Sequence, residues 1–258
     1  MSTTNPQNEL LQQLRLANHV TVITGAGMSA ESGVPTFRDA SDGLWAQFDA
    51  YKMASPEGWK EDKNRVWAWY EWRRKLVKQC LPHAGHFAIA QLSEALSAVR
   101  GGKVGVSLIT QNVDDLHERA GFVGAMHVHG SLFAPRCSAC GRPGEFLADS
   151  LQEACTHLPP PKCGHCGGFI RPGVVWFNEG LDTRLWSQAV RSVQECDVLL
   201  VVGTSGVVRP VSGLPQLAKE HGVWVCEVNP NATELSSSVH LAWRVSAAEG
   251  LPALVQQL

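Results

Sequence analysis

The sequence predicts an α/β protein in which a Rossmann-like, doubly wound parallel sheet carries a smaller inserted zinc-binding and helical domain. The first observation is alternation: short β-branched runs such as "HVTVIT", "VGVSLIT" and "DVLLVV" are separated by segments with helical apolar spacing. The second is the glycine turn "TGAG" directly after the first run, which is typical of a buried strand feeding a tight bend. The third is a cysteine- and proline-rich stretch at 136–171 that interrupts the alternation and lacks a periodic apolar pattern.

The individual elements follow from these patterns. Residues 1–8 are polar, and we expect them to form a frayed tail. The expected helices are residues 9–18, 62–79, 83–99, 114–121, 182–195, 210–222 and 247–258. The expected strands are residues 19–24, 104–110, 173–177, 197–204 and 223–229. We assign residues 1–38, 83–129 and 173–258 to the Rossmann-like domain, and residues 39–82 and 130–172 to the small helical and zinc-ribbon domain.

Composition limits the classes of function. With 44% hydrophobic residues and 18% charged residues, the chain can bury a sizeable core. The net charge is -2 and the basic residues are scattered, so we expect no nucleic-acid partner. No apolar run reaches the roughly 18 residues of a membrane span, and the polar N-terminus lacks the apolar core of a signal peptide. We therefore expect no membrane partner and a cytoplasmic location, where cysteines stay reduced.

The glycine turn after the first strand is a candidate phosphate-binding site. Gly25, Ala26, Gly27 and Ser29 fit G-x-G-x-x-A, in which glycines let the backbone approach a pyrophosphate at a helix start. A purely structural glycine turn is the alternative. The acidic residue that Rossmann dehydrogenases carry about 20 residues further on has no clear counterpart. We therefore expect a dinucleotide to bind in a geometry unlike that of dehydrogenases.

The cysteines form two C-x-x-C pairs separated by 22 residues. The pairs are Cys137 with Cys140 and Cys163 with Cys166. Four thiolates close a tetrahedral Zn²⁺ site and leave no position for water, so we expect one structural zinc ion. The alternatives are redox chemistry at the pairs, or replacement of one ligand by a spare donor. The spare donors are Cys155, His157 and His165.

Polar residues gather at the end of the second expected strand. Gln111, Asn112 and Asp114 lie in "TQNVDDLHERAG", where ligands bind in doubly wound folds. Two histidines, His127 and His129, follow in "MHVHGSLF". A histidine with a near-neutral pKa can act as general base, and the alternative is a hydrogen-bonded structural histidine.

Taken together, these motifs resemble those of the sirtuins, the NAD-dependent protein deacylases. The matching pieces are "GAGMSAESGVPTFR", "TQNVDDLHERAG", "HVHGSLF", the two cysteine pairs, "RPGVVWFNEG", "GTSGVV" and "VNPN". They occur in the family's order and cover residues 20–247. The resemblance implies NAD as co-substrate, bound between a Rossmann domain and a zinc domain. It also implies that His129 is the catalytic base, assisted by Asn112, and that His127 is a strand residue.

The resemblance further implies which residues contact NAD. By this resemblance, the pyrophosphate is contacted by Gly25, Ala26, Gly27 and Ser29. The loop over the nicotinamide ribose contains Phe37 and Arg38. That ribose is contacted by Gln111 and Asn112, and the carboxamide by Asp114. Gly203, Thr204 and Ser205 match a second phosphate-side turn, Asn229 and Asn231 match the adenosine-ribose segment, and Ala247 matches a position near the adenine.

The resemblance places the substrate peptide as an added strand against residues 173–177 and 205–208. Val175, Trp176 and Phe177 are the implied peptide-binding residues. The family usually has glycine in the turn that follows, whereas this chain has Asn178. Asparagine tolerates a left-handed backbone, so we expect the turn to survive, although the peptide contacts there can differ.

The aromatic segment "VWAWYEWRRKL" matches the Tyr-x-x-Arg class of sirtuins, which accepts acidic acyl groups. Tyr70 and Arg73 are three apart and share a helix face, so the guanidinium can pair with a distal carboxylate beside the phenol. In the alternative, Tyr70 only packs against the tryptophans and Arg73 faces water. Trp67 and Trp69 are expected to be packing residues. We also expect Ala50 to leave room for the acyl chain, and Arg74 and Lys75 to be solvated.

The sequence therefore predicts an NAD-dependent lysine deacylase that removes succinyl, malonyl and also acetyl groups. The implied products are nicotinamide, free lysine and 2′-O-acyl-ADP-ribose, and the expected partners are acyl-lysine proteins. The alternatives are an ADP-ribosyltransferase or NAD glycohydrolase, and a non-catalytic NAD-binding scaffold. The sequence identifies neither the protein substrates nor the oligomeric state, and it is compatible with a monomer.

Overall fold

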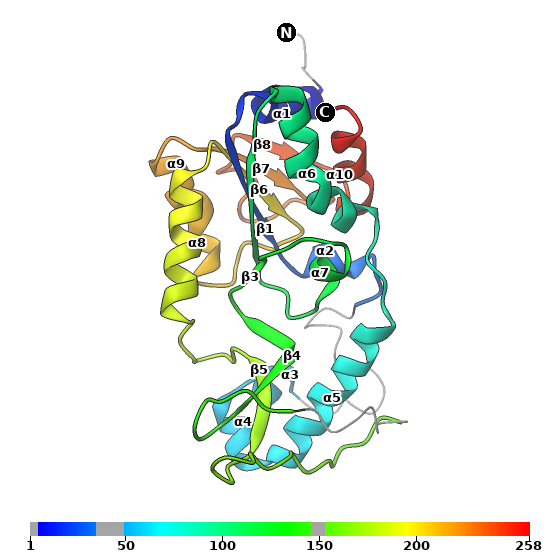
Figure 1. Cartoon of the computed structure of the whole chain (residues 1–258), viewed down its shortest axis with the longest axis vertical. Helices are drawn as coiled ribbons and strands as arrows, with labels where there is room; N and C mark the ends of the chain where they lie inside the picture. Colours follow the sequence, from blue (N-terminus) through cyan, green and yellow to red (C-terminus); the bar gives the residue numbers. More distant parts are fainter. Residues whose placement is uncertain (1–4, 35–48, 146–152) are drawn as a thin grey trace.

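The computed structural model describes residues 5–34, 49–145 and 153–258, which form two lobes (Figure 1). The larger lobe holds a six-stranded sheet between helices. The smaller lobe holds a two-stranded sheet beside the long helix α5 (Lys63–Gln79). This two-lobed α/β architecture confirms the predicted fold class.

The large sheet is parallel throughout, and its strand order is β3-β2-β1-β6-β7-β8. Its strands are β1 (His19–Thr24), β2 (Gly105–Thr110), β3 (Met126–His127), β6 (Val198–Val202), β7 (Trp224–Val228) and β8 (Leu241–Trp243). The chain leaves β1 toward one side and returns to pair β6 on the other side of β1. The carboxyl ends of β1 and β6 therefore flank a topological switch point, where ligands bind in doubly wound folds.

Helices cover both faces of this sheet (Figure 1). One face carries α1 (Pro6–Leu16), α6 (Ala84–Arg100) and α10 (Ala247–Val255), and the other carries α8 (Thr183–Glu195) and α9 (Leu214–Glu220). Successive strand residues point to opposite faces, so Val22 enters the first core and Ile23 the second. Burial of both faces explains why the strands are continuous apolar runs.

Short helical turns lie at the carboxyl edge of the sheet and connect it to the next elements. They are α2 (Ala26–Ala30), α7 (Leu116–Arg119) and the 3₁₀ turn η2 (Val211–Gly213). The longer α6 is capped at its N-terminus by His83, whose ring nitrogen accepts a hydrogen bond from the Gly85 N–H at 3.0 Å. Gly101 caps its C-terminus in the left-handed conformation (φ 67°), which glycine accommodates without strain.

The smaller lobe comprises α3 (Ala50–Met53), α4 (Pro56–Glu61), α5, β4 (Gly130–Cys137) and β5 (Ile170–Val174). Strands β4 and β5 are antiparallel. Asp62 caps α5 by accepting the Arg65 N–H at 3.0 Å. As predicted, Trp67 and Trp69 are packing residues, with 1% and 2% of their surface exposed. The aromatic mass of α5 therefore builds the core of this lobe.

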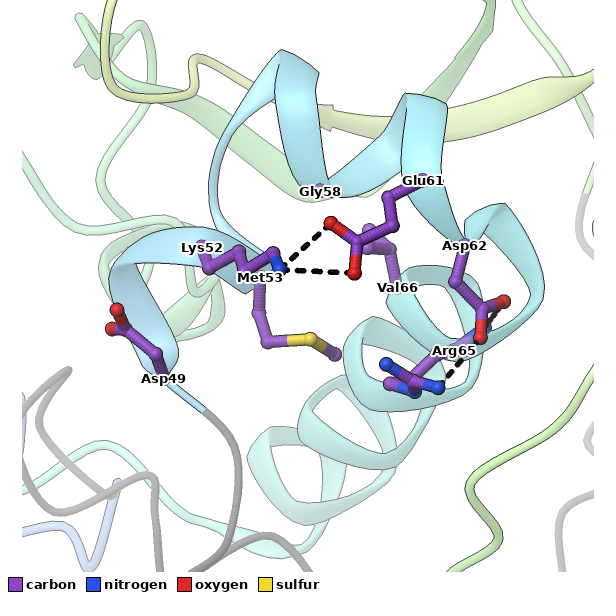
Figure 2. Close-up of a pocket in the computed structure, with 8 residues that line it drawn as sticks. All are labelled: Asp49, Lys52, Met53, Gly58, Glu61, Asp62, Arg65 and Val66. Atoms are coloured by element: carbon purple, nitrogen blue, oxygen red, sulfur yellow. Dashed lines mark hydrogen bonds and ion pairs between the residues drawn. The ribbon is translucent and has the colours of Figure 1, made fainter.

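Figure 2 shows the corner where α3, α4 and α5 meet around a small pocket. Lys52 pairs with Glu61 at 2.7 Å and Arg65 with Asp62 at 3.0 Å, but these side chains are 30–54% exposed. Exposed pairs of this kind contribute about 0–1 kcal/mol. Gly58 matters more, because a Cβ there would lie 2.0 Å from the Lys52 carbonyl oxygen. Close backbone packing therefore holds this corner together.

Several predicted boundaries differ from the structure. Helix α1 begins at Pro6, because the Asn5 side chain caps it by accepting the Gln7 N–H at 3.1 Å, so the frayed-tail prediction is wrong for residues 6–8. The short elements α3, α4 and β8 were not predicted, since three to six residues carry too little periodicity. The helix expected at 210–222 divides into η2 and α9.

The strand expected at 173–177 is observed at 170–174 instead. Val175 still bonds in register with the residue that precedes β4, and after it the backbone leaves the β4–β5 ladder. Val175 donates to the His129 carbonyl at 2.8 Å, and Phe177 donates to the Ala54 carbonyl at 3.0 Å. The prediction failed here because the apolar run "GVVWF" continues past the point where pairing ends. None of the helices in the described ranges is long and apolar enough to cross a membrane.

Two buried histidines join α6 to the short helix α7. The rings of His86 and His117 have centroids 5.0 Å apart, and these residues are 0% and 1% exposed. His86 accepts the His83 N–H, and His117 bonds the Thr24 hydroxyl at 3.0 Å. Burial lowers the pKa of His86 to about 2 and that of His117 to about 4. Both side chains are therefore neutral at neutral pH.

This burial predicts a loss of stability in mild acid. Below the unfolded pKa of about 6.5, the unfolded chain binds a proton at His86 that the folded chain does not bind. Between about pH 7.5 and pH 6.0 this lowers the free energy of unfolding by about 1 kcal/mol. His86→Asn keeps an acceptor for the His83 N–H but cannot titrate. Urea unfolding at both pH values should therefore show a loss about 1 kcal/mol smaller in the variant. Equal losses would contradict this assignment.

Candidate active site at the carboxyl edge of the sheet

A cavity of about 1010 Å³ lies between the carboxyl edge of the large sheet and the small lobe. The sequence-predicted residues that line it are Gly25, Ala26, Gly27, Ser29, Tyr70, Arg73, Gln111, Asn112, Asp114, His129, Val175, Trp176, Phe177, Gly203, Thr204, Ser205, Asn229 and Asn231. These residues come from segments spread over most of the chain. The fold therefore brings the predicted phosphate, histidine and Tyr-x-x-Arg motifs to one cavity.

Two glycine turns interlock at the switch point. The Gly27 N–H donates to the Gly203 carbonyl at 2.7 Å, and Gly203 has φ +60°. A Cβ at Gly25 would lie 2.8 Å from the Thr204 Cβ, and one at Gly203 would lie 2.4 Å from the Met28 nitrogen. Side chains at these positions would separate the turns. The glycines therefore leave bare backbone at the cavity floor, as an extended phosphate group requires.

The polar residues after β2 are fixed by hydrogen bonds to these turns. The Gln111 amide donates to the Thr204 hydroxyl at 3.0 Å, and the Asn112 amide donates to the Ser29 hydroxyl at 2.9 Å. Asp114 is 4% exposed, and burial raises the pKa of its carboxyl. This part of the cavity is thus preorganised by the ends of β1, β2 and β6.

A buried carboxylate that sequence reasoning missed holds the loop at the other end of the cavity. Glu227 is 0% exposed in β7 and pairs with Arg244 at 2.8 Å. The same Arg244 nitrogen lies 3.0 Å from the Asn231 carbonyl and 3.3 Å from the Asn229 carbonyl. Glu227 also accepts hydroxyl hydrogen bonds from Thr233 and Ser236. The sequence does carry a signal for this residue, which is a glutamate inside the apolar run "VCEV". A carboxylate is rarely buried unless it has a partner, so a glutamate in a buried strand predicts a nearby cation or hydroxyl donor.

The two histidines of "HVH" have different surroundings. His129 Nδ1 lies 3.2 Å from the Gln111 carbonyl oxygen, which can only accept, so this nitrogen carries the proton and Nε2 keeps its lone pair. Burial lowers the pKa of His129, which keeps the ring neutral. His127 instead contacts the Asn112 carbonyl and, at 2.8 Å, Glu118. Burial opposes protonation of His127, but Glu118 outweighs it and raises its pKa. His127 lies in β3, as expected, and His129 faces the cavity.

The far end of the cavity lies against α5, where Tyr70 and Arg73 share one helix face. Arg73 Nη1 is buried and has no hydrogen-bond partner among the described residues. Its guanidinium carbon is 4.9 Å from the centre of the Trp69 ring. Burial lowers the pKa of Arg73, but an arginine side chain stays protonated in proteins. Arg73 as a residue is half-buried, but its Nη1 atom is shielded from water, so the alternative in which Arg73 faces water is wrong for this atom.

The neighbouring arginine, Arg74, is buried, which differs from the prediction. Arg74 was expected to be solvated, but it is 6% exposed and pairs with Glu71 through contacts of 2.6 and 3.2 Å. Position 74 faces the lobe interior, and Glu71, one turn earlier, neutralises it there. Lys75 lies partly buried over the Trp72 ring. Helix α5 thus holds one buried arginine that is paired and one whose Nη1 has no partner among the described residues.

The segment after β5 forms the mouth of the cavity. The Trp176 N–H donates to Glu179 at 2.9 Å, so the backbone N–H groups of Val175, Trp176 and Phe177 all have acceptors within the chain. Asn178 has φ 68°, which confirms the expected left-handed turn. A peptide strand at this segment must therefore donate its own N–H groups to the carbonyl oxygens of residues 175–177, because the N–H groups of these residues are already in use.

The four predicted zinc ligands come together at the end of the small lobe. Their Sγ atoms all lie within 4.8 Å of one another. The Cys137–Cys166 and Cys140–Cys163 sulfur distances are 3.5 and 3.8 Å. Tetrahedral Zn²⁺ with bonds of about 2.3 Å separates its sulfurs by about 3.8 Å. The arrangement fits one zinc ion, and Cys155 lies outside the cluster.

A few predicted residues do not reach the cavity, and other residues complete it. Ala247 is 4% exposed at the start of α10, where it packs against α6, and Ala50 packs in the small-lobe core. Phe37 and Arg38 lie outside the described residues. Sequence reasoning did not identify the apolar wall, which has no motif of its own. This wall comprises Val34, Trp69, Val77, Val113, Leu132 and Val174.

Known proteins with similar sequences and structures point to one family. A family model described as the Sir2 family matches residues 25–210. A protein of Mycolicibacterium paratuberculosis named NAD-dependent protein deacylase is 48% identical over 239 residues, 93% of this chain and 97% of that protein. A protein of the same name from Corynebacterium glutamicum is 46% identical over 244 residues, 95% of this chain and 93% of that protein.

Solved structures agree with these relatives. A Sir2 homologue in complex with NAD has a TM-score of 0.85 and 40% identity, covering 97% of this chain and 93% of that chain. A mutant Sir2 homologue in complex with 2′-O-acetyl ADP ribose has a TM-score of 0.84 and 39% identity, covering 96% and 95%. The strand order, the switch-point cavity and the thiolate cluster define a Rossmann-like protein with a metal-binding lobe. The chain belongs to the Sir2 family.

Proposed function

We propose that this chain removes acidic acyl groups, succinyl and malonyl, and also acetyl, from lysine side chains of proteins. It is an NAD-dependent protein deacylase, as its relatives are named, and the proposal concerns the acyl group and the residues that act on it. The observation that carries the proposal is the buried Arg73 Nη1, without a partner among the described residues, at the cavity end shared with the Tyr70 side chain.

The physical argument concerns the energy of a buried cation. A charged group in a dry site needs a partner, because burial removes its hydration. An acetyl group ends in a methyl, which offers Arg73 no partner. A succinyl or malonyl group ends in a carboxylate, which can accept from the guanidinium and from the Tyr70 hydroxyl. Burial raises the pKa of Tyr70, so its phenol stays protonated and can donate.

The opposite end of the cavity fits NAD. The bare backbone of the interlocked glycine turns suits the pyrophosphate, and Ser29 and Thr204 place hydroxyls beside it. Asn229 and Asn231 lie on the loop that Glu227 and Arg244 hold, where an adenosine ribose fits. We assign Gln111, Asn112 and Asp114 to the nicotinamide ribose and carboxamide, as the family resemblance implies.

The residues of the chain then have defined tasks. Bound NAD supplies the ribose carbon from which nicotinamide leaves, and the acyl-lysine oxygen takes that position. Asn112, anchored by Ser29, orients the ribose. His129 accepts a proton from a ribose hydroxyl at Nε2, since Nδ1–H is held by Gln111. The apolar wall keeps water from the ribose carbon while nicotinamide leaves. One water molecule is then consumed as the acyl group passes to the ribose hydroxyl and the lysine amine departs, so the products are nicotinamide, free lysine and 2′-O-acyl-ADP-ribose.

The remaining assignments support this arrangement. The four cysteine thiolates hold one structural zinc ion in a closed site. The substrate peptide lies between residues 175–178 and the loop at 205–208. Exposed Phe177, Val207 and Val208 offer apolar surface there, 36–43% exposed in each case.

Arg73→Met tests the acyl preference. The expected result is a fall in kcat/KM of about ten- to hundredfold for a succinyl-lysine peptide, since a hydrogen bond to a charged group contributes about 1.5–3 kcal/mol. For the matched acetyl-lysine peptide, kcat/KM should change little. Mass spectrometry of both peptides with NAD measures this. Lys78→Met, which removes a cation from the exposed end of the same helix, is the matched control and should leave both rates unchanged.

Three outcomes would overturn parts of the proposal. Succinyl removal that is unaffected by Arg73→Met would show that another group reads the carboxylate. Nicotinamide release with an intact acyl-peptide would indicate an NAD glycohydrolase, and ADP-ribose on the protein substrate would indicate an ADP-ribosyltransferase. Absence of any NAD turnover by the folded protein would indicate a non-catalytic scaffold.

A further inference from the structure

The Tyr70 hydroxyl has a hydrogen-bond partner whose chemistry sets its direction. The indole Nε1 of Trp176 lies 3.0 Å from the Tyr70 oxygen. An indole nitrogen can only donate, so the phenol oxygen must accept this bond. Tyr70 and Trp176 are 6% and 3% exposed, and both line the cavity. The contact therefore occupies one lone pair of the hydroxyl in a dry environment.

This bond leaves the proton of Tyr70 to point elsewhere. A hydroxyl that accepts one bond keeps a single O–H donor, which rotates to suit its surroundings. With the indole N–H on one side of the oxygen, the proton cannot point toward Trp176. The free donor is thereby available to a group in the cavity, and a carboxylate, which only accepts, matches it.

The indole itself is held by a partly buried ion pair between Arg171 and Glu179. The Arg171 guanidinium carbon lies 3.3 Å from the centre of the Trp176 ring. Arg171 forms a bidentate pair with Glu179 at 2.6 and 2.9 Å, and Glu179 also accepts the Trp176 backbone N–H at 2.9 Å. The Trp59 ring packs against the same indole at 5.7 Å. A cation over the ring face attracts electron density and strengthens the N–H donor.

We propose that Trp176 is a positioning residue for acyl specificity: its indole N–H orients the Tyr70 hydroxyl as a donor toward the carboxylate of the acyl group. This inference rests on the proposed function. It changes the role expected of Trp176, since the buried side chain acts through Tyr70 and does not contact the peptide. Arg171 and Glu179 hold the indole in place for this purpose.

Trp176→Phe tests the inference, because phenylalanine keeps an aromatic ring and removes the N–H. We expect kcat/KM for a succinyl-lysine peptide to fall about tenfold, as loss of one oriented hydrogen bond predicts. For the acetyl-lysine peptide we expect a change within about twofold. Trp224→Phe is the matched control, since it makes the same tryptophan-to-phenylalanine change in β7, where the ring packs in the large-lobe core and does not line the cavity. It should leave the succinyl-to-acetyl ratio unchanged.

A double-mutant cycle with Tyr70→Phe separates positioning from packing. If Trp176 acts through the Tyr70 hydroxyl, Trp176→Phe should not alter the succinyl-to-acetyl ratio further in the Tyr70→Phe background. A full additional effect there, or equal losses on both peptides in the single variant, would overturn the inference. Failure of the proposed function gives a different result. In that case Arg73→Met does not reduce succinyl removal in a chain whose Trp176 is unchanged.

Discussion

Replacing His129 by alanine is expected to lower kcat/KM for deacylation by about 10²- to 10⁴-fold, the usual contribution of a positioned general base. The structure gives the reason. Nδ1–H donates to the Gln111 carbonyl, burial lowers the pKa of the ring, and the neutral Nε2 faces the cavity. Alanine leaves no group there to accept the ribose proton. Rates on an acyl-lysine peptide with saturating NAD, followed by mass spectrometry, measure the loss.

Two further readouts make this prediction specific. NAD affinity, measured by calorimetry, should change little in His129→Ala, because the proposed contacts to the pyrophosphate and the adenosine ribose come from other residues. His127→Gln is the matched control, since it removes a nearby imidazole whose nitrogens both have partners. We expect it to reduce activity by less than about tenfold. Near-normal deacylation by His129→Ala would assign the base to another group.

Removing the zinc site is expected to abolish activity and unfold the small lobe. Structural zinc contributes about 10–16 kcal/mol of apparent binding free energy in small domains, and in such sites this is folding free energy. Cys163→Ser weakens one of the four ligands, and Cys163 is itself packed in a small core with Trp67 and Ile170. The loss should reach the cavity, because β4 begins directly after His129 and β5 leads to Val175.

Metal analysis, near-ultraviolet circular dichroism and limited proteolysis of Cys163→Ser measure these effects. We expect less than one zinc per chain, reduced aromatic signal and new cleavage in the small lobe. Cys155→Ser is the control, because Cys155 lies outside the thiolate cluster, and it should keep its zinc and activity. Full zinc content in Cys163→Ser, or loss of zinc in Cys155→Ser, would contradict the assigned ligand set.

Much of the candidate site followed from local sequence. Glycine turns, C-x-x-C pairs and polar residues after a buried strand act through backbone geometry or ligand chemistry that a few residues define. Parallel strands then bring these motifs to one edge, so the fold class alone places Gly25, Asn112 and Thr204 together. At two positions the local sequence did not predict the observed structure. Ala247 has a family match but is buried against α6, and the strand expected at 173–177 stops at Val174.

The sequence by itself thus determined the doubly wound fold, the zinc ligands and the family motifs, because periodicity and spacing encode them locally. Only the tertiary structure decided which charged side chains are shielded from water and which of them have a partner. Arg73 and Arg74 are adjacent on one helix, yet Glu71 pairs Arg74 while Arg73 Nη1 has no partner among the described residues. Likewise, the Trp176–Tyr70 bond joins residues 106 positions apart. Burial and long-range pairing depend on how distant segments pack, and no short pattern records that packing.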